Sequence, residues 1–225
     1  MCRQDDRTAK KKATMTHVLF AYHTFQAATG YSILIIRTNN HTSQAEIKQK
    51  AKTVIMSVLQ QQRYLKIYIK DDTAPHHPIT IELLPNAAPE TVKHAINLVQ
   101  AGLFNNGNCS FYRSDFVIQF GLHGSNVKNP YQDLRVNETP MYEKISNTRG
   151  TISVAHFDVP DNGNSEYFIN LCENKHLDSV YGGYCVFGKI YPNDTQSFHT
   201  VDYIATKIKQ GGSTTKVSIE RIDFV

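Results

Sequence analysis

The run from Cys109 to Gly121 holds the residue types best suited to chemistry in this sequence. It brings one permanent cation, Arg113, close to an aromatic ring, Phe116, and to a side-chain amide, Gln119. The apolar residues around them predict a strand over 111–119. A buried cation in such a run is unfavourable unless it lies at an edge. A guanidinium beside an aromatic pocket could serve a neutral, proline-like group rather than a phosphate.

Strand-like runs dominate the sequence that must position these residues. Beyond the run just described, alternating or continuous apolar patterns predict strands at 65–69, 79–83, 150–155, 167–171, 185–190 and 217–224. The Pro75–Pro78 stretch predicts a hairpin turn between the first two of these strands. A histidine pair at 76–77 is interpreted as part of that turn and not as a metal site.

Two helices interrupt the strands of this region. The first is predicted to begin near Pro89, to be capped by Asn86 or a neighbour, and to end at Gly102. Its apolar face consists of Val92, Ala95, Ile96 and Val99. The second is predicted over about 199–207. Many antiparallel strands with only two helices predict a mainly β fold, a closed barrel capped at its ends.

The first quarter of the chain has a different character. Residues 1–14 form a charged tail, and residues 15–62 form an N-terminal extension of α/β type that precedes the main domain, 63–225. Within the extension, strands are predicted at His17–Phe25 and Tyr31–Arg37. A helix follows, with Ser43 and Glu46 at the spacing of a capping box. Its apolar face could pack on its own domain or on a partner, and a homo-oligomer through this extension is one possibility.

Composition narrows the function classes. With 40% hydrophobic and 20% charged residues, the chain resembles an ordinary globular protein. Its net charge of +4 arises largely from the tail, where Lys10–Lys12 could touch nucleic acid or an acidic membrane. No aromatic platform interleaves with these lysines, so no nucleic-acid partner is expected. The uncharged run 13–36 contains too many polar residues for a membrane-spanning helix.

The four cysteines point away from metal chemistry. They show no CxxC spacing and no nearby paired histidines, so a zinc site is not expected. Cys172 and Cys185 lie in strand-like runs and are predicted to be buried thiols, which suits a reducing, cytoplasmic or other intracellular soluble compartment. The frequent Asn, Ile, Lys and Tyr suggest an AT-rich genome, and for a virus-encoded protein the alternative location is a virion or viral factory.

Several segments, in order and spacing, resemble the cyclophilin family of peptidyl-prolyl isomerases over about residues 64–225. The segments that carry the resemblance are Glu82-Leu-Leu-Pro with Ala-Pro-Glu-Thr-Val92, Phe111-Tyr-Arg113 with Phe116-Val-Ile-Gln119, 147–155, 165–170, His176-Leu-Asp178 and 184–189. The loop pattern is similar to the bacterial-like branch of the family. The resemblance implies a closed eight-stranded antiparallel barrel with a helix at each end and a substrate groove on its outer face.

The resemblance also implies roles for residues in that groove. Cyclophilins accelerate rotation about X-Pro bonds, whose barrier is about 18–20 kcal/mol, without a metal or cofactor. Arg113 matches the catalytic arginine, which donates to the prolyl nitrogen as the amide twists, and Gln119 matches the amide that orients it. The positions implied to bind a proline-containing peptide or protein are Phe116, Val117, Ala155, His156, Glu166, Phe168, His176, Leu177 and Tyr184.

The sequence departs from the family pattern at this groove. The link between Arg113 and Phe116 is two residues shorter than usual, and its Asp115 could pair with the arginine or face solvent. Glu166 stands where the family has glutamine and could attract Arg113 away from substrate. His176 replaces an aromatic residue associated with cyclosporin binding, so weak binding at best is expected. We therefore expect weak or lost isomerase activity with retained peptide binding, or alternatively a catalytically inactive binding or structural module.

Overall fold

The computed structural model describes residues 24–27, 30–33, 43, 45–46, 48–50, 53, 63–71 and 75–225. The predicted charged tail, 1–14, and most of the extension over 15–62 lie outside these ranges. Within the described ranges, no helix combines the length and apolar character needed to cross a bilayer.

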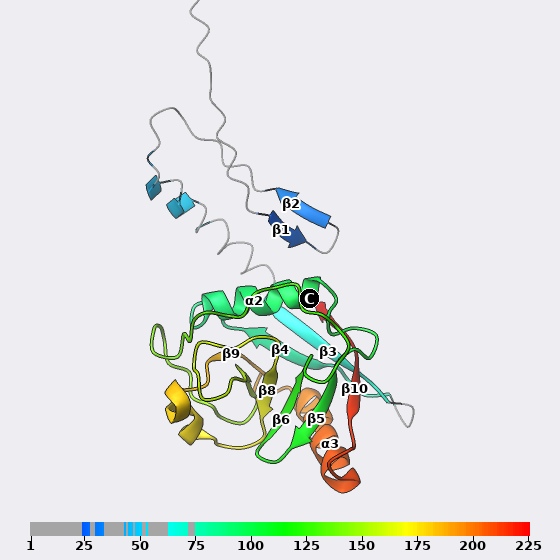
Figure 1. Cartoon of the computed structure of the whole chain (residues 1–225). Helices are drawn as coiled ribbons and strands as arrows, with labels where there is room; N and C mark the ends of the chain where they lie inside the picture. Colours follow the sequence, from blue (N-terminus) through cyan, green and yellow to red (C-terminus); the bar gives the residue numbers. More distant parts are fainter. Residues whose placement is uncertain are drawn as a thin grey trace, which may run out of the picture.

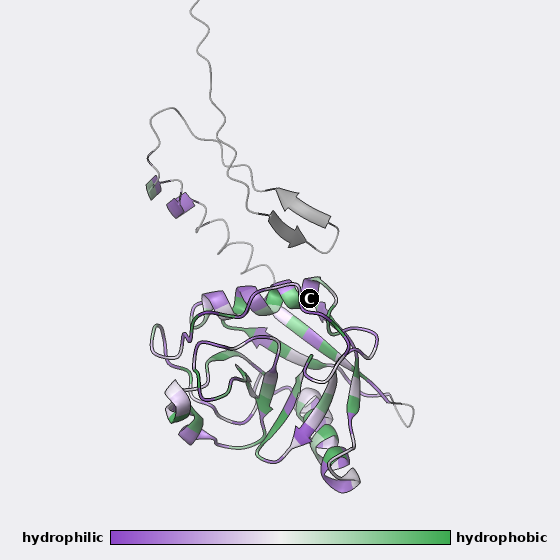
Figure 2. Cartoon of the chain, in the orientation of Figure 1, coloured by the Kyte–Doolittle hydropathy of each residue, from purple (hydrophilic) through white to green (hydrophobic). Residues whose placement is uncertain are grey.

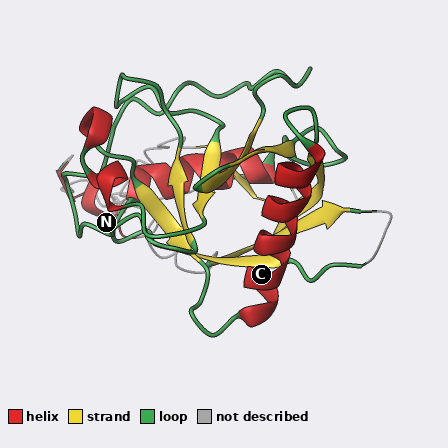
Figure 3. Ribbon diagram, turned by 90° about the horizontal axis from the view of Figure 1, so that it is seen from below, coloured by secondary structure: helices red, strands yellow, loops and turns green. Residues whose placement is uncertain are grey.

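Eight strands form a closed antiparallel barrel, which confirms the predicted fold (Figure 1). Around the barrel they follow the order β10-β3-β4-β9-β7-β8-β6-β5, and β10 closes the ring by pairing with β5. Figure 3 shows this ring with the helices packed against it. The strands are β3 (Tyr64–Lys70), β4 (Ile79–Leu83), β5 (Ser110–Ser114), β6 (Val117–Gly121), β7 (Thr151–Val154), β8 (Tyr167–Asn170), β9 (Val186–Lys189) and β10 (Val217–Phe224).

The single strand predicted over 111–119 is wrong, because the run forms the hairpin β5–β6. The turn lies at Asp115, whose Oδ1 accepts hydrogen bonds from the backbone nitrogens of Phe116 (2.8 Å) and Val117 (3.3 Å). Aspartate commonly stabilises turns in this way. Because both arms of the hairpin are rich in apolar residues, the hydrophobic pattern did not indicate the turn between them. The hairpin places Arg113 directly opposite Gln119.

Alternation along the strands separates the core from the outer face. On β6, Ile118 and Phe120 belong to the main core, whereas Val117 packs in a separate outer cluster. On β8, Ile169 faces the core and Phe168 joins the outer cluster. Figure 2 shows the corresponding bands of hydrophobic and hydrophilic residues along the strands. The barrel interior is therefore a filled core, and chemistry is left to the outer face.

Helix α2 (Pro89–Gln100) buries the predicted apolar face and ends before Gly102, whose φ of 66° breaks the helix. Its N-terminal cap was predicted wrongly, since no neighbouring side chain caps it. Instead the buried carboxylate of Glu138 accepts hydrogen bonds from the backbone nitrogens of Glu90 (3.1 Å) and Thr91 (2.7 Å). A residue remote in sequence thus satisfies the free donors of the first turn.

Helix α3 (Thr195–Gly211) extends beyond the predicted 199–207 at both ends. Asp194 caps its start by accepting from the backbone nitrogen of Ser197 at 3.0 Å. Gly212, with φ 79°, follows its end. The polar first and last turns explain why apolar periodicity alone gave a shorter helix.

The described part of the N-terminal extension contains a hairpin and a helix start. Strands β1 (Thr24–Ala27) and β2 (Gly30–Ile33) pair antiparallel. β1 overlaps the C-terminal end of the first predicted strand, and β2 overlaps the N-terminal part of the second. Ser43 and Glu46 form the predicted capping box: the Glu46 carboxylate accepts from the Ser43 nitrogen at 2.8 Å, and the Ser43 hydroxyl accepts from the Glu46 nitrogen at 3.2 Å. The apolar face predicted for the following helix lies outside the described residues.

Three cysteines are described, and all are free. Cys185 is buried, as predicted, and so is Cys109. Cys172 is exposed, so its prediction as a buried thiol was wrong. It lies just after the end of β8, where the chain leaves the sheet.

Candidate active site

A groove of about 570 Å³ lies on the outer face of the barrel. It brings together every site residue predicted from the sequence except His176. Three lining residues, Phe157, Asp158 and Tyr181, are additional to that prediction. The complete lining is Arg113, Phe116, Val117, Gln119, Ala155, His156, Phe157, Asp158, Glu166, Phe168, Leu177, Tyr181 and Tyr184.

An apolar slot forms the floor of the groove. Val117, Phe168 and Leu177 are buried in one cluster. The rings of Phe116 and Tyr184 and the methyl group of Ala155 pack around it. Because Phe168 pairs with Gln119 across β6 and β8, the slot lies directly beside polar groups. Such a slot suits a small apolar ring flanked by peptide groups.

A buried amide, Asn174, holds the slot residues in place. Its Nδ2 donates to the backbone oxygen of Phe116 at 2.9 Å and to Oδ1 of Asn170 at 2.8 Å. Its backbone oxygen accepts from the nitrogen of Leu177, whose own oxygen accepts from the nitrogen of Tyr184, both at 2.8 Å. Asn174 was not among the predicted site residues, because nothing local distinguishes a buried asparagine from one in a surface turn.

Arg113 is held by the residue two positions after it. Its Nε and Nη2 donate to Oδ2 of Asp115 at 2.9 and 2.7 Å. Both side chains are about half exposed, and the guanidinium lies 5.7 Å from the ring centroid of Phe116. Of the two roles that the sequence allowed for Asp115, pairing is the one observed. Among the described residues, no hydrogen bond joins Gln119 to Arg113, so the predicted orienting contact is absent from this structure.

Among the described residues Glu166 forms no ion pair with Arg113, contrary to expectation. Its Oε2 accepts from the hydroxyl of Tyr112 at 2.6 Å and from Nε2 of Gln119 at 3.3 Å. Its Oε1 accepts from the backbone nitrogen of His123 at 2.7 Å. Three neutral donors thus hold the carboxylate.

Tyr112 reaches Glu166 because β5 has a register irregularity between Phe111 and Arg113, and such bulges redirect side chains. Its hydroxyl also accepts from Nε2 of Gln119 at 2.6 Å. Burial, followed by the hydrogen bond to Glu166, raises the pKa of Tyr112. The hydroxyl therefore stays protonated and able to donate near neutral pH. Because a bulge cannot be recognised from a hydrophobic pattern, Tyr112 was not among the predicted site residues.

Ring stacking and hydrogen bonds hold the edge of the groove at His156. The imidazole stacks on the ring of Tyr184, with centroids 4.2 Å apart and planes 14° from parallel. Its Nε2 lies 3.1 Å from the backbone oxygen of Gly183. The backbone nitrogen of Ala155 is already bonded to the oxygen of Glu166 at 2.8 Å. The Ala155 nitrogen is therefore engaged within the barrel and is not free to pair with an added strand.

His176 lies outside the groove lining, which corrects its assignment as a wall residue. It belongs to η1 (Lys175–Asp178), a turn of 3₁₀ helix. Its exposed ring meets the outer edge of Phe116, with centroids 5.6 Å apart. The turn directs Leu177 into the slot and leaves its neighbour His176 behind Phe116.

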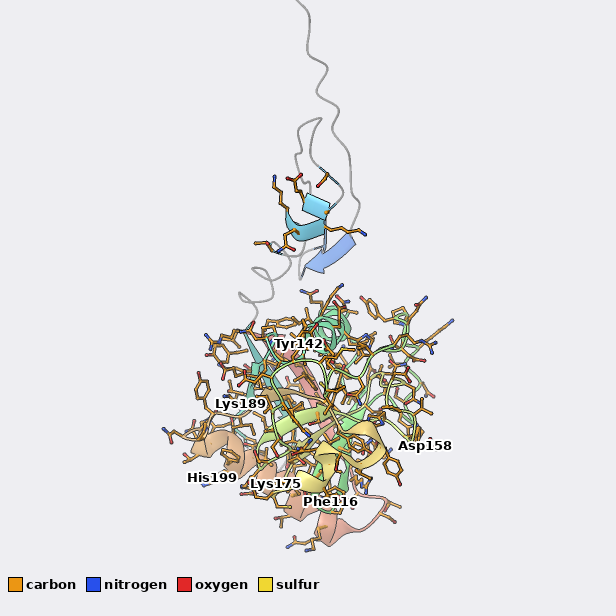
Figure 4. The ribbon with its side chains drawn as sticks, turned by 90° about the vertical axis from the view of Figure 1, so that its left-hand side faces the viewer. Phe116, Tyr142, Asp158, Lys175, Lys189 and His199 are labelled. Atoms are coloured by element: carbon orange, nitrogen blue, oxygen red, sulfur yellow. The ribbon has the colours of Figure 1, made fainter. Side chains whose placement is uncertain are left out.

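Two exposed aromatic rings and a carboxylate complete the rim. Phe157 is 79% exposed and Tyr181 57%. Tyr181 lies in η2 (Val180–Gly182) and has φ 52°, a backbone conformation that residues other than glycine rarely adopt. In Figure 4, Phe116 and Asp158 lie on the side of the barrel that carries η1 and η2. No sequence motif distinguishes these rim residues, so they were not among the predicted site residues.

The arrangement supplies an apolar slot, a cation beside it and an ordered polar wall. No set of three His, Cys, Asp or Glu side chains in the described ranges could hold a metal ion. No nucleophile and base pair lines the groove. The chemistry that it offers is binding and hydrogen bonding, which is sufficient for rotation about a bond.

Comparison with known proteins assigns the family. The sequence profile described as "Cyclophilin type peptidyl-prolyl cis-trans isomerase/CLD" matches residues 64–223. "Peptidyl-prolyl cis-trans isomerase B" of Escherichia coli is 31% identical over 126 residues, covering 51% of this chain and 73% of that protein. A peptidyl-prolyl cis-trans isomerase of Helicobacter pylori is 33% identical over 134 residues, covering 59% and 75%.

Solved structures support the same fold. A cyclophilin type peptidyl-prolyl cis-trans isomerase of Cryptosporidium parvum, crystallised in the presence of the dipeptide Ala-Pro, has a TM-score of 0.56 at 20% identity, covering 72% of this chain and 98% of that one. The cyclophilin AquaCyp293 from Hirschia baltica has a TM-score of 0.57 at 12% identity, covering 82% and 81%. Barrel, groove and profile together lead to one conclusion: the chain belongs to the cyclophilin family of peptidyl-prolyl cis-trans isomerases.

Proposed function

We propose that the groove isomerises X-Pro bonds in protein segments, at a rate reduced by the ion pair between Arg113 and Asp115. The proline ring occupies the slot of Val117, Phe168 and Leu177. The guanidinium of Arg113 donates to the prolyl nitrogen. The single observation that carries the reduced rate is the pair of hydrogen bonds, 2.9 and 2.7 Å, from the guanidinium to Asp115.

Twisting the amide localises a lone pair on the prolyl nitrogen, and a donor placed there lowers the barrier. Arginine has five N–H donors, of which Asp115 engages two in this structure. The remaining donors stay free to reach substrate, but the side chain must hold its pose or break the pair. A displacement of about 1 Å can reduce a rate on the order of a hundredfold. We therefore expect the isomerase activity to be reduced but not completely lost.

A binding module without catalysis is the second candidate. It is favoured by the contrast between well-packed slot residues and an arginine already paired with Asp115. Such a protein would hold proline-containing segments without accelerating their isomerisation. In either case we place the protein in a reducing intracellular compartment, supported by the three free thiols of the described chain.

Exchange NMR on an Ala-Pro peptide separates the two candidates. We expect measurable catalysed exchange, lost on Arg113→Ala and partly retained on Arg113→Lys, with peptide affinity in all three proteins within a few fold. Binding without catalysed exchange would establish the binding module. Exchange that survives Arg113→Ala would remove this residue from the mechanism. Turnover equal to that of Escherichia coli isomerase B, measured alongside, would contradict the reduced rate.

A further inference from the structure

Glu166 places a negative charge in the groove without a cation to balance it. Its three hydrogen-bond donors, the Tyr112 hydroxyl, the Gln119 amide and the His123 backbone nitrogen, are all neutral. None of the ion pairs found in the described part of the chain includes Glu166. Its charge therefore acts on whatever occupies the groove.

The rest of the lining does not neutralise this charge. Arg113 is the single arginine or lysine among the lining residues, and Asp115 already balances it at 2.7 Å. Asp158 adds a second, exposed carboxylate to the lining. The groove is consequently acidic, although the chain as a whole carries a net charge of +4.

Hydrogen bonds and packing hold the Glu166 carboxylate in one position. Both of its oxygens face donors, Oε1 the His123 nitrogen and Oε2 the Tyr112 hydroxyl. A glutamine at this position could keep the His123 contact with its oxygen, but the Tyr112 hydroxyl would then have to accept from its NH₂ group instead of donating. The carboxylate also lies against Gly121, where an added Cβ would come within 1.9 Å of Oε1. The site thus accommodates a carboxylate and holds it in one place.

We propose that the groove selects X-Pro segments that carry lysine or arginine next to the proline. The proposal rests on the proposed function only in that the groove binds X-Pro peptides. A basic side chain beside the bound proline gains attraction from Glu166 and Asp158, whereas an acidic one is repelled. A partly exposed charge pair changes affinity by up to about fivefold, so reversing the peptide charge should change it about tenfold.

The test measures dissociation constants and catalysed exchange on the same NMR samples. Two peptide sets carry Lys, Ala or Glu immediately before or immediately after the proline. We expect the lysine peptide of at least one set to bind about tenfold more tightly than its glutamate counterpart. Equal affinities in both sets would overturn the proposal. Charge-dependent binding without catalysed exchange would support this inference and contradict the isomerase proposal. Catalysed exchange without charge-dependent binding would support the isomerase proposal and overturn this inference.

Variants locate the selecting charge. Glu166→Gln should reduce the lysine-to-glutamate ratio to about threefold or less, and Asp158→Asn should reduce it in part. Glu143→Gln removes an equal charge from a separate hollow lined with Arg63 and Glu82, and it should leave the ratio unchanged. For the unaltered protein, 1 M salt shortens the screening length to about 3 Å and should nearly abolish the preference. A ratio that survives both Glu166→Gln and high salt would refute the role of this carboxylate.

Discussion

The side-chain amide of Asn174 donates a 2.9 Å hydrogen bond to the backbone carbonyl of Phe116, across 58 positions of sequence. The same amide donates to Asn170, and the backbone of Asn174 supports Leu177. One buried residue therefore joins the β5–β6 turn to the 3₁₀ turn on the opposite side of the slot. Polar contacts as well as apolar packing therefore hold the slot residues in place.

Asn174→Ala should destabilise the protein by about 1–3 kcal/mol, because it removes the donor to the buried Oδ1 of Asn170 and one of the donors to the Phe116 oxygen, which also accepts from the Leu171 nitrogen. Urea unfolding measures the loss. Peptide affinity should fall as well, since the slot loosens. Asn126→Ala is the control: this exposed residue should change stability by no more than about 0.5 kcal/mol. Equal effects of the two substitutions would contradict the role of Asn174.

Asp115→Asn should raise kcat/KM for an Ala-Pro peptide by up to about fivefold, because the contribution of an exposed ion pair is about 0–1 kcal/mol. The asparagine oxygen can still accept from the Phe116 nitrogen and keep the turn. Asp223→Asn is a matched control, since Asp223 pairs with Arg221 at the same sequence spacing and at 2.8 Å. A fall in kcat/KM for Asp115→Asn alone would mean that the pair positions Arg113 productively.

Stability should depend on pH through Asp178, next to the slot residue Leu177. Burial acts to raise the pKa of Asp178, but hydrogen bonds from Ser146 and Asn147 outweigh it and lower the pKa below its ordinary value of 3.8. A lowered pKa in the folded state means that the carboxylate stabilises the fold above about pH 4 and that this stabilisation is lost as the pH falls further.

The measurement is the free energy of unfolding at pH 7 and near pH 3, for the unaltered protein and for Asp178→Asn. The variant should be less stable at pH 7, and the difference in unfolding free energy between the two proteins should be smaller near pH 3. Asp161→Asn, at an exposed position, should produce no such change. A gap independent of pH would show that the charge of Asp178 has no part in the effect.

Iodoacetamide at pH 8 should modify Cys172 rapidly and leave the buried thiols unmodified. Burial raises the pKa of Cys185 to about 11 and raises that of Cys109 as well, so few of these thiols are ionised and none is accessible. Mass spectrometry of the digested protein identifies each site. Labelling in urea provides the control, because Cys109 and Cys185 should then react as well as Cys172. Rapid native modification of Cys185 would contradict its burial.

The strand pattern and the first helix were predictable because their information is local. Alternation over 65–69 and 79–83 marks a hairpin, and apolar positions from Val92 to Val99 mark one face of a helix. The order of several short motifs identified the family and placed nearly the whole lining of the groove. The same local reasoning failed over 111–119, where continuous apolar character concealed a turn.

By itself, the sequence determined the barrel, its helices and the gathering of Arg113, Phe116 and Gln119, since periodicity and motif order depend on neighbours along the chain. Only the tertiary structure decided the partners. Glu166 bonds to Tyr112, 54 positions away, and not to Arg113. Glu138 caps a helix that begins far before it. Such pairings depend on register, bulges and burial, which bring together residues that no local pattern connects.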